Sequence, residues 1–351
     1  MERLTIQAIE RCVRWLMPFA AWRMPDADEV SFCAAPSLMS APDSAAASDG
    51  FFICPFGRPF AEACRIPFEI DVAEVLSMDA PQRPLPKLPH ESTGKDEYIT
   101  RLSSLITNLK ARGNAKTVIS TVKTEEMPSG DTAGHIAMMA KHLFANGKGL
   151  FCNCWYHPRL GLWMGASPEL LVSIRGRRLK SVALAGTTAI DSEWDDKNKA
   201  EQQFVVDYIA DVLAANNAVT EVSPTYEAPF GRLKHLRTDF AASLPDGADI
   251  EAIIDGLNPT PALCGYPKGQ ALNDIALIES HQRECYGGLV GVACGDAFDA
   301  FVNIRCARLG DGQCKYFSGG GITADSVPET EWAEAQAKRQ QLINFFNQEN
   351  S

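Results

Sequence analysis

The sequence predicts an α+β fold with large antiparallel β-sheets flanked by helices. Its strand-like segments come in neighbouring pairs joined by short turns. Residues 149–157 and 160–167 flank the turn HPRLG, and residues 170–184 form a hairpin pattern around Gly176. Short turns join antiparallel strands, whereas parallel strands need a long crossover. The mixture of helices with such strand pairs therefore favours this class over a doubly wound parallel sheet.

The first third of the chain predicts one helix followed by short strands and loops. Apolar residues recur at helical spacing over residues 4–17, and Pro18 follows directly. Short strands are expected over residues 51–56 and 63–70. Loops are expected over residues 41–50 and 81–90. Four prolines in the second loop block both helix and strand pairing.

The rest of the chain predicts alternating helices and strands that end in an amphipathic helix. Apolar residues at helical spacing predict helices around residues 98–112, 136–144, 195–214, 271–282 and 329–347. Additional strands are expected over residues 116–121 and 301–309, and FSGGGITADS is expected to form a glycine-rich turn. We expect residues 1–90 and residues 91–351 to belong to a single domain.

Composition excludes several classes of protein. The chain has 351 residues, of which 46% are apolar and 22% charged, as is typical of a globular protein. Its formal net charge of −11 argues against binding to nucleic acid or to an anionic membrane surface, because both need clustered Lys and Arg. No stretch approaches the ~20 apolar residues of a membrane span. A small anionic ligand stays open, since it needs only a local cationic pocket.

The cysteines indicate a cytoplasmic protein with free thiols. There are eleven, an odd number, and no two have the C-x-x-C spacing of a zinc site. Cys152 and Cys154 are the closest pair and would share one face of a strand. The N-terminal segment mixes charged with apolar residues, which argues against a signal peptide.

Glu169 is the first candidate for chemistry. It follows Ser167 and Pro168 at the end of an expected strand, and proline fixes the local backbone. A surface glutamate in a turn is the more common explanation of such a pattern. The functional alternative is a general acid held where burial raises its pKa.

Two further patterns point to anion or cation binding. The run of Gly319, Gly320 and Gly321 could converge backbone N–H groups on an anion, although a flexible loop is an equally simple explanation. On the final helix, Glu331, Glu334 and Lys338 share one face. They could form a solvated ion-pair face or hold a hard cation such as Mg²⁺.

Three single residues complete the candidates. Arg305 is expected on a strand, on the same face as Asn303, and an arginine on an apolar strand needs an anionic partner. Glu201 and His235 taken alone are ordinary residues of a helix and of a strand.

Together these motifs resemble one family. The segments GASPELLVSIRGRRLKSVALAGT, HLRT, LNPTPALCGYP, R-E-C-YGGLVG, NIRCARL, FSGGGITADS and EWAEAQAK occur in the order found in chorismate-utilising enzymes. That family includes the isochorismate, salicylate, anthranilate and aminodeoxychorismate synthases. The resemblance covers residues 114–346 and implies the fold of that family.

The resemblance implies a set of binding residues for chorismate and Mg²⁺. Glu201 and Glu334 match the glutamates that hold the metal, and Glu331 is a further candidate one turn away. Lys338 matches a lysine near the ring carboxylate. The remaining substrate-binding positions that match are Gly186, Thr187, His235, Ala262, Arg305, Gly319, Gly320 and Gly321.

The resemblance also implies the nucleophile. Ala185 stands where some aminodeoxychorismate synthases have a nucleophilic lysine, and Lys116 matches the lysine of the water-activating type. The expected activity is that of an isochorismate synthase, in which Lys116 accepts a proton from water and Glu169 donates one to the departing C4 hydroxyl. We expect a role in menaquinone biosynthesis, or alternatively in siderophore biosynthesis, and no obligatory protein partner.

The sequence alone leaves other functions open besides isochorismate synthase. Salicylate synthase is the nearest, followed by anthranilate synthase and by a non-catalytic chorismate-binding homologue. The chain departs from the family pattern at Thr121, Asn258 and Gln282. None of these departures removes an expected acid, base or metal ligand.

Overall fold

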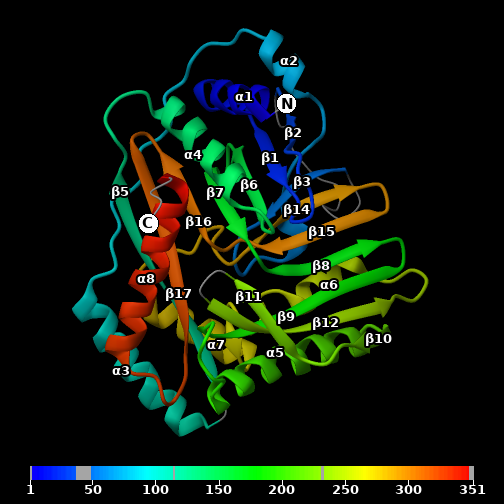
Figure 1. Ribbon diagram of the computed structural model, residues 1–351, viewed down its shortest axis with the longest axis vertical. Helices are drawn as coiled ribbons and strands as arrows, with labels where there is room; N and C mark the ends of the chain where they lie inside the picture. The colour runs from blue at the N-terminus through cyan, green and yellow to red at the C-terminus, as the bar shows by residue number, and fades with distance from the viewer. Residues whose placement is uncertain (1, 37–48, 114, 231–232, 348–351) are drawn as a thin grey trace.

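A computed structural model describes residues 2–36, 49–113, 115–230 and 233–347 and confirms an α+β fold with two large antiparallel sheets (Figure 1). The first sheet has eight strands in the order β13 (Gly265–Tyr266), β5 (Lys116–Glu126), β17 (Gln313–Ile322), β16 (Cys306–Gly310), β7 (Gly161–Ser167), β6 (Phe151–His157), β1 (Phe19–Arg23) and β2 (Ser31–Ala34).

The second sheet has nine strands. Their order is β10 (Val219–Val222), β12 (Leu233–Ser243), β9 (Arg178–Ala189), β8 (Leu170–Arg175), β15 (Ala297–Val302), β14 (Leu289–Cys294), β3 (Gly50–Cys54) and β4 (Cys64–Ile66), and β11 (Tyr226–Phe230) also pairs with β12. The first third of the chain therefore adds β1 and β2 to one sheet and β3 and β4 to the other. The expected strand over residues 63–70 is shorter because Pro67 has no N–H to donate to the ladder.

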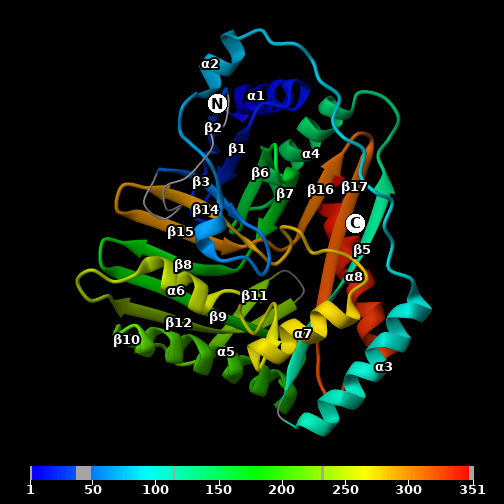
Figure 2. The same cartoon turned by 180° about the vertical axis from the view of Figure 1, so that it is seen from behind.

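Helices cover the outer faces of both sheets (Figure 1). α1 (Glu2–Trp15), α4 (Thr132–Asn146) and the end of α8 (Pro328–Asn347) pack on the first sheet. α5 (Asp196–Ala215) and α6 (Ile250–Leu257) pack on the second. α3 (Lys95–Arg112) and α7 (Lys268–Ile278) lie beside β5, as Figure 2 shows from behind, and the short α2 (Val72–Ser77) packs near α1.

Alternation along the strands divides the apolar residues between an inner and an outer core. On β6, Phe151 and Trp155 point to the cluster shared by both sheets, whereas Cys152 and Cys154 point to the helices outside. The rings of Phe151 and Phe301 stack across the two sheets with centroids 4.1 Å apart. All eleven cysteines lie within the described ranges as free thiols, and all except Cys294 are buried.

Two expectations about the strands were wrong. Residues 318–321 lie inside β17, paired with β5, and do not form a turn. Arg305 is not on a strand, because β15 ends at Val302 and β16 begins at Cys306. Instead it lies where the chain crosses from the second sheet to the first, with a left-handed φ of 49°. Within the described residues, no helix is long and apolar enough to span a membrane.

Candidate active site

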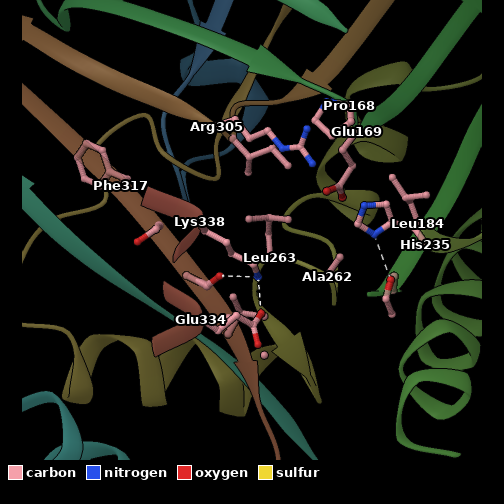
Figure 3. A pocket seen from close by; sticks show the side chains of 18 of the residues that line it. Pro168, Glu169, Leu184, His235, Ala262, Leu263, Arg305, Phe317, Glu334 and Lys338 are labelled. Carbon is pink, nitrogen blue, oxygen red and sulfur yellow. Dashed lines mark hydrogen bonds and ion pairs between the residues drawn. The ribbon is translucent and has the colours of Figure 1, made fainter. Parts of the chain in front are cut away.

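One cavity of about 430 Å³ lies where α5, α8 and strands of both sheets meet (Figure 3). It brings together residues that are more than two hundred positions apart in the sequence. The expected site residues that line it are Lys116, Glu169, Gly186, Glu201, His235, Ala262, Arg305, Gly319, Gly320, Gly321, Glu331, Glu334 and Lys338. The side chain of Thr187 lies outside the part of the chain that the structure describes.

The three glycines of β17 form a floor without side chains. A Cβ atom on Gly321 would lie 2.4 Å from Cε of Lys116, and one on Gly320 would lie 3.4 Å from Oε2 of Glu331. The glycines therefore leave room for a lysine from β5 on one face of the strand and for a carboxylate from α8 on the other. This corrects the expected anion nest, because none of the three has a positive φ.

The exposed edge of β17 still presents backbone groups to the cavity. Lys338 Nζ donates to Gly319 O at 3.2 Å, so this carbonyl faces away from β5. Alternate residues of an antiparallel strand point their polar groups to the same side, so those of Gly321 face the same way. The amides of Gly319 and Gly321 can thus serve an anion along an open strand edge.

Glu169 lies between the end of β7 and the start of β8, where the chain passes from one sheet to the other. Its backbone is fixed on both sides, since Glu169 N donates to Ser167 Oγ at 3.2 Å and its carbonyl accepts from Val302 N at 3.0 Å. Thr260 Oγ1 donates to Glu169 Oε1 at 3.3 Å. The sequence pattern of serine and proline before this glutamate thus corresponds to a rigid connection.

The electrostatic surroundings of Glu169 suit a proton donor. Its side chain is buried, and burial raises its pKa to about 7. The hydrogen bond from Thr260 and the positive charges of Lys116 and Arg305 oppose this rise. A carboxyl group with this pKa carries a proton on a large fraction of molecules near neutral pH.

Lys116 begins β5 and is only 5% exposed. Its Nζ atom lies over Gly321 and is 3.6 Å from Oε2 of Glu201, which comes from the first half of α5. This α-helix is held against β9 by Gln202, whose Oε1 accepts from Ala185 N at 2.8 Å. Gln202 was missed by the sequence analysis, although it is the neighbour of Glu201.

The carboxylates of α8 lie on the opposite face of β17 from Lys116, over Gly320. Glu334 Oε1 is 2.7 Å from Lys338 Nζ, and Glu331 is buried beside it (Figure 3 labels Glu334 and Lys338). Carboxylate oxygens are the ligands that Mg²⁺ prefers, so Glu201, Glu331 and Glu334 are a chemically suitable set. Among the residues that the structure describes, however, no three acidic, histidine or cysteine side chains form a ready metal cluster.

His235 on β12 lies beside a bulge at Gly186. The β9–β12 register shifts at this point, and Gly186 takes a left-handed φ of 67°. The Gly186 carbonyl lies 3.1 Å from His235 Nδ1, and a carbonyl only accepts, so Nδ1 carries the proton. Burial lowers the His235 pKa, and the charges of Arg305 and Lys338 lower it further. The neutral ring therefore has an acceptor at Nε2.

Arg305 enters the cavity from the crossing between the two sheets, next to Pro168 and Glu169 in Figure 3. Burial lowers its pKa to about 10, against the attraction of Glu169. A guanidinium with that pKa still carries its charge at neutral pH. The left-handed backbone at Arg305 is costly for a non-glycine residue and is of the kind that clusters at functional sites.

Tyr286 and Thr260 were missed by the sequence analysis. Tyr286 lines the cavity, stacks on Phe317 with ring centroids 5.4 Å apart, and lies close to Gly319. Both residues occur in motifs that resemble the family, YGGLVG and LNPTPA, which were the available signal.

The departures from the family pattern lie away from the cavity lining. Thr121 bonds to Ser318 Oγ at 2.9 Å between β5 and β17, and Gln282 is exposed. Asn258 is buried and its carbonyl accepts from Lys268 Nζ at 2.6 Å.

Known proteins resemble this chain in sequence and in fold. It is 32% identical to isochorismate synthase EntC of Escherichia coli (strain K12) over 200 residues, which are 53% of this chain and 51% of that protein. It is 29% identical to isochorismate synthase MenF of the same organism over 303 residues, which are 80% of this chain and 68% of that protein. The chain thus spans about half the length of EntC.

The fold is shared with the solved structure of MenF, the menaquinone-specific isochorismate synthase from Escherichia coli. The two superpose with a TM-score of 0.78 at 21% identity, covering 95% of this chain and 91% of the other. The sequence model of the family described as chorismate binding enzyme matches residues 72–347. Because this match covers most of the chain, the protein belongs to the family of chorismate binding enzymes.

Proposed function

We propose that this chain is an isochorismate synthase, which adds water at C2 of chorismate and removes the C4 hydroxyl. The observation that carries the proposal is the meeting of Lys116 and Glu169 in one cavity. One is a buried amine that can act as a base, and the other is a carboxyl group with a pKa of about 7. Groups of this kind in one pocket are typical of an acid and base pair.

The proton transfers balance without a redox partner. Neutral Lys116 accepts a proton from a water molecule as the water oxygen bonds to C2. Protonated Glu169 donates its proton to the C4 hydroxyl, which leaves as water while the ring double bonds shift. One water is added and one is lost, so the product is an isomer of the substrate. Exchange with solvent then returns both side chains to their starting states.

The remaining residues hold a dianionic substrate in an acidic protein. Arg305 and the amides of Gly319 and Gly321 meet the carboxylate of the enolpyruvyl arm, and Lys338 meets the ring carboxylate. His235 offers an acceptor to a hydroxyl group. Gly186 and Ala262 shape the wall, Thr187 stays a proposed substrate-binding position, and Gly320 leaves space for the α8 carboxylates.

Glu201 and Glu334, with Glu331, are proposed to hold a Mg²⁺ ion. Their oxygen donors fit this hard cation, and all three line the cavity. When bound, Mg²⁺ supplies the positive charge that lets an anionic substrate approach anionic side chains. The work of proton transfer stays with Lys116 and Glu169.

The proposal also covers the nucleophile, the pathway, the location of the protein and its protein partners. Ala185 offers no amine for attack on the ring, which favours water as the nucleophile. The likeness to MenF, whose name specifies menaquinone, supports a role in menaquinone biosynthesis. Free thiols suit a reducing cytoplasm, and the proposal includes no obligatory protein partner.

Product analysis tests the proposal. Purified protein is incubated with chorismate and Mg²⁺, and the products are separated by chromatography. We expect isochorismate to accumulate without added ammonia. Salicylate without accumulated isochorismate, or anthranilate formed from ammonia, would assign a different activity. Binding of chorismate without turnover would make the chain a non-catalytic binding protein.

A further inference from the structure

Two of the three glutamates proposed to hold the metal, Glu201 and Glu334, are paired with lysines of the same cavity. Lys116 Nζ lies 3.6 Å from Glu201 Oε2, and Lys338 Nζ lies 2.7 Å from Glu334 Oε1. The first pair is largely buried, with side chains 6% and 15% exposed. The second is more open, at 42% and 48%. Each carboxylate therefore already has a cation beside it.

The two lysines have other tasks in the proposed reaction. Lys116 is the base for the attacking water, and Lys338 meets the ring carboxylate. An ammonium whose charge is balanced by a glutamate attracts a substrate carboxylate less strongly. Lys338 also donates to Gly319 O, so two of its three donors are already used. In this arrangement carboxylates of the protein engage both lysines.

We propose that Lys116 and Lys338 are internal counter-cations that Mg²⁺ displaces from Glu201 and Glu334. This inference rests on the proposed function of the site. Binding of the metal exchanges two monovalent partners for one divalent partner. The glutamates pass to the metal, Lys116 turns to the water, and Lys338 turns to the substrate. Lys116 leaves the ion pair as an ammonium and releases one proton to solvent before it acts as the base, and no other covalent bond changes in this exchange.

The exchange links the binding of the metal to that of the substrate. Lys338 pairs with Glu334 and is also the proposed partner of the ring carboxylate. A substrate carboxylate that binds Lys338 weakens the hold of Lys338 on Glu334. Substrate and Mg²⁺ should therefore strengthen the binding of each other, because coupling between two ligands is reciprocal.

Calorimetric titration with Mg²⁺ tests the competition. Lys116→Met and Lys338→Met remove the charge and keep the length of the side chain. We expect Mg²⁺ affinity to rise about tenfold for Lys116→Met and roughly two- to fivefold for Lys338→Met, since exposed ion pairs are weaker than buried ones. Lys123→Met is the matched control, because Lys123 pairs with Glu125 on the same strand but outside the cavity. Its Mg²⁺ affinity should equal that of the wild type.

Crystal structures with and without Mg²⁺ separate displacement from simple repulsion between charges. We expect both N–O separations to lengthen beyond the ~4 Å of an ion pair once the metal is bound. Ion pairs that persist beside a bound Mg²⁺, or lysine variants that bind Mg²⁺ no tighter than the wild type, would overturn the inference and leave the proposed activity standing. Wild-type protein that binds Mg²⁺ with these shifts but forms no isochorismate would overturn the activity instead.

Discussion

Glu169 illustrates at the residue scale how burial and function are linked. Its raised pKa comes from the loss of water around the carboxyl group and is only partly offset by Thr260, Lys116 and Arg305. A group that must be protonated loses its function as the pH rises through its pKa. The rate of the wild-type enzyme should therefore fall above pH ~7 with one titrating group. A rate independent of pH between 6 and 9 would exclude Glu169 as the acid.

Glu169→Gln should separate catalysis from stability. The amide keeps the shape of the side chain but has no acidic proton, so kcat should fall by roughly 10²–10⁴-fold with little change in KM. The same substitution should raise the stability of the folded protein at a pH above the Glu169 pKa. The folded-state pKa lies above the unfolded value, so the wild type loses stability as the pH rises from about 4.5 to 7. Thermal unfolding at pH 8 should show the variant to be more stable than the wild type.

Gly321→Ala tests the floor of the cavity. The added Cβ would lie 2.4 Å from Cε of Lys116, so the lysine side chain has to move. We expect a loss of kcat of about tenfold or more, because small misplacements of catalytic groups are costly. Gly269→Ala is the control, since nothing lies within 4 Å of its Cβ position on α7. That variant should keep its activity, and an unchanged kcat in Gly321→Ala would contradict the assignment of Lys116.

At the scale of elements, a buried ion pair joins the end of α7 to β5, the strand that bears the proposed base Lys116. Arg283 and Glu279 are each 3% exposed and lie 2.5 Å apart. Arg283 donates to the carbonyls of Val118 on β5 and of Leu263 next to Ala262, and Glu279 accepts from Ser120 N. The pair thus fixes two walls of the cavity relative to one another.

Single substitutions in this pair should be worse than the double substitution. Arg283→Met leaves the Glu279 charge buried without its partner and should cost about 3–5 kcal/mol of unfolding free energy. Combining Arg283→Met with Glu279→Gln removes both charges and should restore part of that loss. Urea denaturation of the two single variants and the double variant measures the coupling. Additive losses would show that the two charges do not stabilise one another.

Local patterns predicted most elements, and the failures have physical reasons. Helical spacing in residues 98–112 and 195–214 led to α3 and α5, and the hairpin around Gly176 to β8 and β9. The glycines of β17 looked like a turn, because a run of glycines is typical of turns. In the structure they instead leave room for side chains that are remote in sequence. Arg305 looked like a strand residue because alternation along FVNIRCARL does not reveal a crossing between sheets. Thr260 and Gln202 act through contacts that spacing does not encode.

At the scale of the whole molecule, the first 90 residues are built into both sheets. β1 pairs with β6, and β3 pairs with β14. Trp22 and Phe51 contribute to the core that lies between the sheets. The site residues themselves come from positions 116 to 338, so a cut anywhere between them divides the cavity.

This arrangement predicts that residues 91–351 do not fold alone. Removing β1 to β4 exposes the edge of each sheet and opens the core between them, which the rest of the chain has no other element to cover. Circular dichroism and chemical denaturation of that fragment should show no cooperative transition. A fragment that unfolds cooperatively and converts chorismate would contradict the single-domain proposal.

The net charge of −11 is compatible with a dianionic substrate because the cationic groups are concentrated. Lys116, Arg305 and Lys338 face one cavity, where the proposed Mg²⁺ would offset the carboxylates that line it with them. Incorporation of labelled water tests the central claim most directly. In water enriched in oxygen-18 with chorismate and Mg²⁺, the wild type should form isochorismate with the label at the C2 hydroxyl. Isochorismate without the label, or no isochorismate at all, would contradict the account.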